Sequence, residues 1–137
     1  MKPTANKMEH STLQTTPSFS SPNLLDWLEQ QTNEQLNEAP FGIVRMSREG
    51  VVVAYCKSES HITGISTGYA VGKYYFTQIA PCANNMMVAA RYGQPDLDEE
   101  LDYILTYVCD PVKVRLRLLK STQSQYQYFL VNRKSFS

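Results

Sequence analysis

The chain has 137 residues, the usual size of one domain with its own hydrophobic core. It carries 13 Lys+Arg and 13 Asp+Glu, so no net charge is available to attract nucleic acid or an anionic membrane. Because no run approaches the roughly 18 apolar residues of a membrane span and the first residues lack the apolar core of a secretory signal, the sequence predicts a soluble cytoplasmic protein.

Cysteine and histidine are scarce in this sequence. The three cysteines, Cys56, Cys82 and Cys109, are odd in number and far apart, which argues against a disulfide framework and against a zinc-binding Cys-x-x-Cys pair. The two histidines, His10 and His61, lie in polar segments, where a histidine is more often solvated than bound to a metal or a haem. The sequence therefore predicts a reducing compartment and no metal site.

The first twenty residues are rich in Ser, Thr, Pro and Lys, and we expect residues 1–20 to form a flexible tail. Ser21 and Pro22 are typical of a helix start, and the apolar positions that follow predict a short amphipathic helix over residues 22–31. Trp27 would anchor this helix as a cap on the domain, which we expect to span residues 21–137.

A β-hairpin is predicted next. Residues 41–46 and 51–56 are two apolar runs joined by a short turn that ends in Gly50, which can adopt positive φ. The second run is apolar on both faces, so it is either covered on both sides or lines a cavity. Residues 57–72 are mostly polar and contain several glycines, a pattern typical of short helical turns and loops.

An aromatic segment, residues 74–79, predicts a short helix that stops before Pro81 and presents Cys82. A second helical run is expected over residues 84–91, which would place Cys82 near its N-terminus. There the helix dipole favours the reactive thiolate that attacks electrophiles and carries acyl groups. The alternative is that Cys82 is a packing residue, because free cysteines are among the most buried residues.

Three strands are predicted in the last third of the chain, over residues 101–109, 113–120 and 125–132. In the middle one, Val114, Leu116 and Leu118 alternate with lysine and arginine, which predicts one core face and one solvated cationic face. The order of elements indicates an α+β fold, a five-stranded antiparallel sheet with short helices on one face and at one end.

Three polar residues have a regular spacing. Glu59 and Thr63 are four apart and would share one face of a helical turn, and Tyr55 precedes Glu59 by four. On spacing alone, the alternative is a tyrosine at the end of a strand followed by a surface turn.

From Phe41 to Arg133 the sequence resembles the photoactive yellow protein family, which consists of small PAS-domain blue-light receptors. The matching landmarks are Phe41-Gly42, Tyr55, Glu59, Ile62-Thr63-Gly64, Val71-Gly72-Lys73, Phe76, Ala80-Pro81-Cys82, Pro111 and Lys113-Val114. The resemblance implies a PAS fold and a chromophore, p-coumaric acid, held as a thioester on Cys82.

The resemblance also implies the other site residues. Tyr55 and a protonated Glu59 would hydrogen-bond the phenolate of the chromophore, and Thr63 would support Tyr55. Light would isomerise the chromophore, Glu59 would give up its proton, and the unpaired buried carboxylate would drive partial unfolding that releases the helix around Trp27. The same resemblance assigns four further residues to the chromophore site: Phe76, Ala80, Pro81 and Cys109.

This sequence departs from the family in three places. The family commonly has an arginine two residues after the threonine, where this chain has Ile65. The segment between Cys82 and Leu101 is shorter, and Cys109 stands where the family has a methionine that assists recovery. We therefore expect slow return to the dark state.

Three functions are compatible with the sequence. The first is a chromophore-bearing photosensor that signals to a downstream protein and is not an enzyme. The second is a chromophore-free PAS module that binds another small molecule or a protein partner. The third is a thiol enzyme that uses Cys82, although neither histidine is placed to act as its base.

Overall fold

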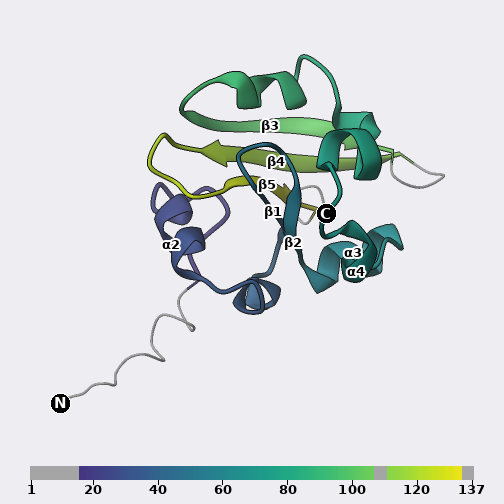
Figure 1. The fold of residues 1–137 in the computed structure, drawn as a ribbon, viewed down its shortest axis with the longest axis horizontal. Coiled ribbons are helices and arrows are strands. Elements are labelled where there is room, and N and C mark those ends of the chain that lie inside the picture. The colour runs from purple at the N-terminus through teal and green to yellow at the C-terminus, as the bar shows by residue number, and fades with distance from the viewer. Residues whose placement is uncertain (1–15, 107–110, 134–137) are drawn as a thin grey trace.

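The computed structural model describes residues 16–106 and 111–133. In these ranges five antiparallel strands form one sheet in the order β2-β1-β5-β4-β3 (Figure 1). The strands are β1 (Gly42–Met46), β2 (Val52–Tyr55), β3 (Leu97–Leu105), β4 (Val112–Lys120) and β5 (Gln127–Asn132). The predicted α+β fold with a five-stranded antiparallel sheet is confirmed. In the β1–β2 hairpin Gly50 has φ 91°, as the turn requires.

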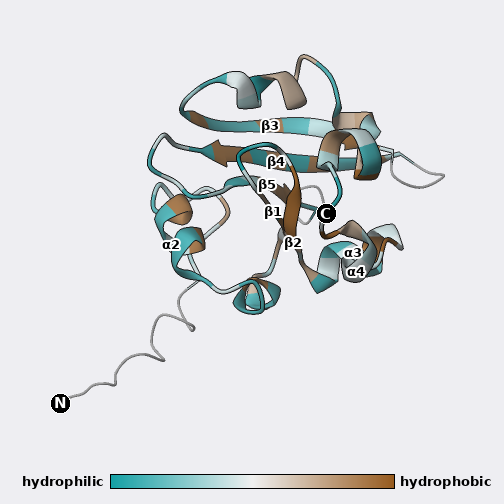
Figure 2. Ribbon diagram, in the orientation of Figure 1, coloured by the Kyte–Doolittle hydropathy of each residue, from teal (hydrophilic) through white to brown (hydrophobic). Residues whose placement is uncertain are grey.

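Short helices occupy most of the remaining chain. They are α2 (Leu24–Gln30), η2 (Gln35–Glu38), α3 (Lys57–Thr63), α4 (Thr67–Ala70), η3 (Tyr75–Ile79), η4 (Pro81–Ala83) and η5 (Ala89–Gly93). The element η3 is a single π-helical turn. Figure 2 shows β2 as apolar along its length. Three of its four residues are buried, whereas Val53 is partly buried and lines a surface pocket, so the expectation that one face of this strand lines a cavity applies.

The sheet is covered on both faces, so the expectation that the helices gather on one face is wrong. Alternate strand residues enter two separate apolar clusters. Val44 and Phe129 pack towards α4 and η3, whereas Ile43 and Leu130 pack against α2. The N-terminal cap, which we define as residues 16–38, therefore forms the second layer of the fold.

Packing in the cap begins before the predicted end of the tail. Phe19 is 7% exposed and its ring packs edge-on against Phe41 at 5.3 Å. Residues 1–15 lie outside the described part of the chain. Helix α2 begins at Leu24 and not at residue 22, and Trp27 on this helix is buried as expected.

The solvated cationic face predicted for β4 is partly wrong. Arg117 is only 4% exposed, because residues of the cap lie across this face of the sheet. Its guanidinium donates to the carbonyl oxygens of Phe19 and Ser21 at 2.9 and 2.7 Å and pairs with Asp98 at 3.0 Å. A sequence pattern can mark this face as polar, but it cannot show that a distant segment covers it.

Two further boundaries differ from the sequence predictions. Strand β3 begins at Leu97, because its acidic residues pair with β4 at the sheet edge. The helix predicted over residues 84–91 is wrong. Asn85 Oδ1 accepts hydrogen bonds from the backbone N–H groups of Met87 and Val88 at 3.0 and 3.1 Å, a turn that competes with a helix.

Candidate functional site

Helix α3 positions Glu59 and Thr63 against the sheet. It follows directly from β2, starting after Cys56 and ending at Gly64, whose φ of 79° terminates it. Cys56 Sγ accepts a hydrogen bond from the backbone N–H of Ile43 at 3.2 Å, which ties the start of the helix to β1. Glu59 is 0% and Thr63 8% exposed, so the predicted shared face of this turn is the buried one.

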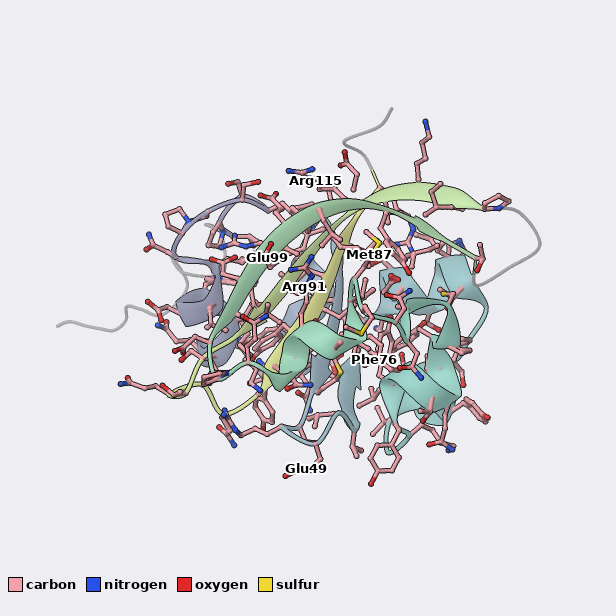
Figure 3. All side chains as sticks on the ribbon, turned by 90° about the horizontal axis from the view of Figure 1, so that it is seen from above. Glu49, Phe76, Met87, Arg91, Glu99 and Arg115 are labelled. Carbon is pink, nitrogen blue, oxygen red and sulfur yellow. The ribbon has the colours of Figure 1, made fainter. Side chains whose placement is uncertain are left out.

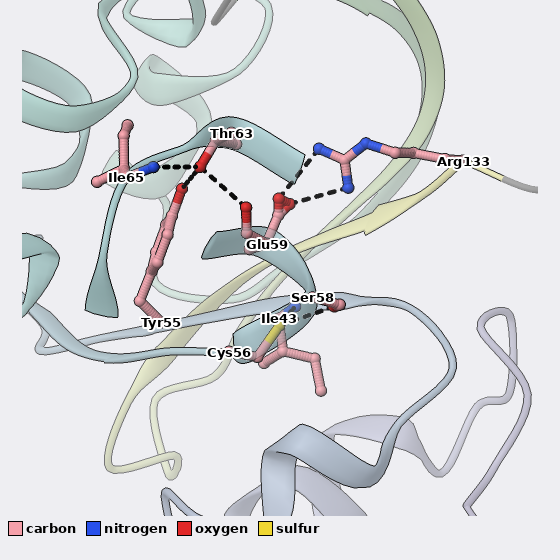
Figure 4. A network of polar contacts seen from close by, with 8 residues as sticks. All are labelled: Ile43, Tyr55, Cys56, Ser58, Glu59, Thr63, Ile65 and Arg133. Carbon is pink, nitrogen blue, oxygen red and sulfur yellow. Dashed lines mark hydrogen bonds and ion pairs between the residues drawn. The ribbon is translucent and has the colours of Figure 1, made fainter. Parts of the chain in front are cut away.

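Tyr55, Thr63 and the helix backbone form a buried hydrogen-bond chain (Figure 4). Thr63 Oγ1 donates to the carbonyl oxygen of Glu59 at 2.9 Å and accepts from the N–H of Ile65 at 3.2 Å. Tyr55 Oη lies 2.9 Å from Thr63 Oγ1. Because the single threonine proton is already donated, the tyrosine hydroxyl is the donor to Thr63. The contact predicted between these two side chains is therefore present.

Burial keeps Tyr55 protonated. The side chain is 2% exposed, and desolvation raises the pKa of its hydroxyl from 10.0 to about 12, although the hydrogen bond with Thr63 acts in the opposite direction. The negative charge of Glu59 adds to the increase. Near neutral pH Tyr55 is thus a proton donor inside an apolar core.

The Glu59 carboxylate is held by Arg133, a residue that the sequence analysis missed. Arg133 donates from Nη1 to Oε2 and from Nη2 to Oε1, both at 3.0 Å, which is a bidentate ion pair (Figure 4). Gly42 of β1 lies beneath it, since a Cβ at this position would be 2.8 Å from Glu59 Oε2. The sequence analysis expected Glu59 to lack a partner only after it had given up its proton, and the structure adds Arg133 as a partner that this expectation did not include.

No local sequence pattern points to Arg133 as a partner of Glu59, and only the pairing of β1 with β5 does so. Gly42 pairs with Val131 across β1 and β5, so the chain just past β5 emerges beside the residue that lies under Glu59. Glu59 and Arg133 are far apart in sequence, and the strand pairing that joins them has to be known first.

Cys82 lies in the single turn η4, and its side chain is partly buried. The predicted position at the start of a longer helix is wrong, so a strong helix dipole cannot be the source of its reactivity. Its side chain packs against the apolar cluster that contains Tyr55 and Ala80, together with the partly buried Phe76 and Ile65. The structure thus brings the thiol and the buried tyrosine to the same cluster.

The backbone of Cys82 is held by Tyr103 of β3, a second residue that the sequence analysis did not identify. The Tyr103 hydroxyl donates to the Cys82 carbonyl oxygen at 2.8 Å and accepts from Asn85 Nδ2 at 2.6 Å. A surface cavity of about 500 Å³ adjoins Tyr103 and is also lined by Met87, Asp102, Ile104 and Lys113. Met87 is exposed and forms part of the wall of this cavity.

Phe76 belongs to an aromatic group beneath η3. Its ring centroid lies 5.1 Å from that of Tyr75, 5.4 Å from that of Tyr92 and 6.1 Å from that of Phe129. Figure 3 shows Phe76 on the opposite side of the sheet from Arg115. Aromatic packing of this kind excludes water from the core on the side where Cys82 lies.

The other residues proposed from the sequence are placed as follows. Pro81 is exposed at the start of η4. Cys109 and His10 lie outside the described residues, and His61 is exposed on α3. Within residues 16–106 and 111–133, no cluster of His, Cys, Asp and Glu is arranged to bind a metal ion. In the same ranges none of the helices is long and apolar enough to cross a membrane.

Solved structures share this fold. The photoactive yellow protein domain from the sensor histidine kinase Ppr of Rhodospirillum centenum aligns with a TM-score of 0.71 and 21% identity, over 79% of this chain and 98% of that chain. The PAS domain of the Cronobacter turicensis RpfR quorum-sensing receptor, in complex with BDSF, aligns with a TM-score of 0.53 and 14% identity, over 70% of this chain and 95% of that chain. The chain therefore has the PAS fold.

Proteins with a similar sequence identify the family, whereas the solved structures identify only the fold. A photoactive yellow protein of Rhodobacter capsulatus is 31% identical over 100 residues, which are 69% of this chain and 79% of that protein. Another from Rhodothalassium salexigens is 24% identical over 119 residues, 84% of this chain and 95% of that protein. No protein-family model matches the chain.

Proposed function

The chain belongs to the photoactive yellow protein family, a family of PAS-domain photoreceptors, and from this premise we propose that it is a blue-light photoreceptor carrying p-coumaric acid as a thioester on Cys82. The observation that carries the proposal is the buried Tyr55–Thr63 hydrogen bond beside the buried Glu59, in the core cluster against which Cys82 also packs. A thiol, an apolar wall and a buried hydroxyl donor suit a phenolic acyl group.

The donor set fits the phenol end of this group. Tyr55 keeps its proton up to a pKa of about 12, so at neutral pH its hydroxyl, which donates to Thr63 here, could turn to donate to a phenolic oxygen instead. Thr63 is fixed by its bond to the helix backbone and keeps Tyr55 in place. Ile65 and Phe76, packed against the same cluster, would keep water from the bound group.

Cys82 would be loaded by acyl transfer. Its sulfur attacks the carbonyl carbon of an activated p-coumarate, a C–S bond forms, and the activating group leaves with the electron pair of the bond that breaks, while the thiol proton passes to solvent. Tyr103 would hold the Cys82 backbone during this step through its 2.8 Å hydrogen bond. When bound, the conjugated acyl group supplies absorption of blue light and isomerisation about its double bond.

Signalling would depend on the pocket and the cap. A change in the hydrogen bonds of Tyr55 and Glu59 would disturb the sheet that holds the cap, and release of α2 with Trp27 would expose a surface for a downstream protein. A photoactive yellow protein domain is part of a sensor histidine kinase in Rhodospirillum centenum, and a signalling protein is accordingly the partner that we propose. A cytoplasmic location stays a prediction.

The test is incubation of the purified protein with activated p-coumaric acid, followed by visible absorption, intact mass and peptide mapping. We expect one coumaroyl adduct, mapped to Cys82 and not to the buried Cys56, with a band that bleaches in blue light and recovers in the dark. Cys82→Ala should take up no pigment. A colourless protein without an adduct, or an adduct confined to Cys56, would contradict the proposal.

A chromophore-free PAS sensor is the second candidate. Two observations favour it: Ile65 replaces the arginine that the family commonly has, and the Glu59 carboxylate is already paired with Arg133. The PAS domain of RpfR, a structural neighbour, is a ligand-bound receptor domain. A protein that resists acylation but is stabilised against heat by a small apolar ligand would support this function.

A further inference from the structure

Cys82 is connected both to the apolar core and to the surface cavity beside β3. Its side chain packs against the cluster that contains Tyr55. Its carbonyl oxygen accepts a hydrogen bond at 2.8 Å from Tyr103, and the side chain of Tyr103 also lines the cavity of about 500 Å³. A cavity of this volume is large enough for a small organic ligand. One tyrosine therefore contacts both the cavity and the residue that would accept the acyl group.

Asn85 joins two walls of this cavity to Cys82. Its Nδ2 donates to the Tyr103 hydroxyl at 2.6 Å, and its Oδ1 accepts from the backbone N–H of Met87 at 3.0 Å. Tyr103 and Met87 both line the cavity. Because the Tyr103 hydroxyl donates its own proton to the Cys82 carbonyl oxygen, it is held by one donor and one acceptor at once. The side chains that shape the cavity thus also fix the position of Cys82.

The lining of the cavity is largely apolar and carries one cation without an ionic partner. Ile104 and Met87 are 53% and 52% exposed, although both are large apolar side chains. Lys113 lies opposite Ile104 in the register of β3 and β4 and is exposed. Asp102, which also lines the cavity, is bound by Arg115 at 2.7 Å, whereas Lys113 forms no ion pair with any described residue. These features suit a ligand with an apolar body and a negatively charged end.

Transfer of an acyl group from a thioester needs space on two sides of the reacting carbonyl carbon. The Cys82 sulfur forms a C–S bond to this carbon, and the bond to the leaving sulfur breaks and leaves its electron pair there. The Cys82 proton passes to solvent, and the leaving thiolate is protonated from solvent, so protons balance. Since the acyl chain would extend into the cluster around Tyr55, the leaving thiol needs a separate place, and the cavity adjoins Cys82 through Tyr103.

We propose that this cavity binds the leaving thiol of a p-coumaroyl thioester while Cys82 is acylated. Ile104 and Met87 contact the apolar body of the thiol, and Lys113 recognises its negative charge. Tyr103 is a positioning residue, which aligns Cys82 through the hydrogen bond to its carbonyl oxygen. The inference rests on the proposed function for the identity of the acyl group, and it adds the class of donor.

The first experiment compares two matched donors, the p-coumaroyl thioesters of 4-mercaptobenzoate and of the uncharged 4-mercaptobenzamide. Intact mass, followed over time at increasing donor concentration, gives the maximal rate of acylation and the half-saturating concentration. We expect half-saturation at a concentration about two- to fivefold lower for the anionic donor. This preference should disappear in Lys113→Gln. It should persist in Lys57→Gln, which removes an exposed lysine from α3, next to the opposite edge strand, β2.

The second experiment changes the wall of the cavity. Ile104→Trp should fill the space and raise the half-saturating concentration of both donors by about tenfold or more, because the apolar surface for the thiol is then covered. Ile62→Trp, at a position 48% exposed on α3, is the matched control and should have no effect. Iodoacetamide is too small to need the cavity and should alkylate Cys82 equally fast in both variants.

The third experiment separates positioning from binding. In Tyr103→Phe the ring still lines the cavity, but the hydrogen bond to the Cys82 carbonyl oxygen is lost. We expect an unchanged half-saturating concentration and a maximal rate lowered by about tenfold, because the sulfur is less well aligned with the donor. Circular dichroism would verify that each variant is folded. A maximal rate equal to that of the wild type would overturn the positioning role.

The outcomes also separate this inference from the proposed function. Wild-type affinity for the donors in Ile104→Trp, or a preference for the anionic donor that survives in Lys113→Gln, would overturn the assignment of the cavity while Cys82 is still acylated. If Cys82 accepts no coumaroyl group from either donor, the photoreceptor proposal fails. Titration with 4-(methylthio)benzoate, an unreactive analogue of the leaving thiol, then decides alone: binding that Ile104→Trp abolishes supports the cavity assignment, and no binding overturns it.

Discussion

Arg45 is the strongest test of how the cap is attached. The side chain is 3% exposed on the cap face of β1. It donates to the carbonyl oxygens of Leu28 and Gln31 at 2.6 and 2.9 Å, to Asn33 Oδ1 at 2.8 Å and to Tyr128 Oη at 3.1 Å. Arg45 is therefore a second buried cation, besides Arg117, that holds the cap in addition to apolar contacts.

Arg45→Met should keep most of the buried volume and remove every one of these donors. Two buried carbonyl acceptors would lose a charged donor, at about 1–2 kcal/mol each, and relief of the desolvation cost of the guanidinium would offset part of this loss. We expect the free energy of unfolding to fall by about 2–4 kcal/mol. The loss of stability should be concentrated in the cap, because the carbonyl groups that accept these hydrogen bonds lie there.

Urea unfolding followed by two probes measures both effects. Trp27 is the single tryptophan and lies in α2, so its fluorescence reports the cap, whereas far-ultraviolet circular dichroism reports the whole fold. In Arg45→Met the fluorescence transition should precede the circular dichroism transition. Arg115→Met removes an arginine paired on the surface with Asp102 and should cost only about 0–1 kcal/mol. An Arg45→Met protein as stable as the wild type would refute the reasoning, because desolvation would then outweigh the hydrogen bonds.

Two further variants test the pocket. Gly42→Ala would place a Cβ 2.8 Å from Glu59 Oε2, and because this carboxylate is pinned by its ion pair we expect a loss of about 1–3 kcal/mol in urea unfolding; Gly68→Ala, whose Cβ would meet nothing within 4 Å, is the matched control and should be neutral or stabilising. The raised pKa of Tyr55 contributes stability that is complete below pH 10 and is lost as the pH rises towards about 12, since the folded state then holds the proton more tightly than the unfolded state. Tyr55→Phe should therefore lose less stability than the wild type between these pH values, and equal losses would show that Tyr55 does not titrate in the fold.

Local spacing predicted the part of the site that lies on adjacent elements. Tyr55 ends β2, and α3 begins two residues later, so the four-residue intervals to Glu59 and Thr63 determine which side chains turn inward. No tertiary information is needed for this step, because one helical turn brings such residues to one face. The strand assignments held for the same reason, since alternation is a local property.

Residues that depend on distant contacts were not predictable. Arg117 alternates with core residues and was expected in solvent, but the cap covers it. Arg133 carries no local pattern at all, and its partner is set by the pairing of β1 with β5. The helix expected after Cys82 failed because Asn85 binds the backbone N–H groups that the helix would have used, a competition that composition does not reveal.

The position of the Arg133 guanidinium connects the pocket around Glu59 to the central sheet. The family arginine expected near Thr63 would come from a loop, and Ile65 stands there instead. The guanidinium that binds Glu59 comes from the end of a central strand, β5. The charge of the pocket is thus linked to the sheet itself, where main-chain hydrogen bonds on both sides restrict movement.

The same strand also holds the cap. Tyr128 of β5 accepts a hydrogen bond from Arg45, the residue that binds the cap carbonyls, and Arg133 just beyond the end of β5 binds Glu59. Since successive strand residues point to opposite faces, β5 presents one side to the cap and the other to the pocket cluster. Loss of the Glu59–Arg133 pair and release of the cap would therefore act on one element from its two faces.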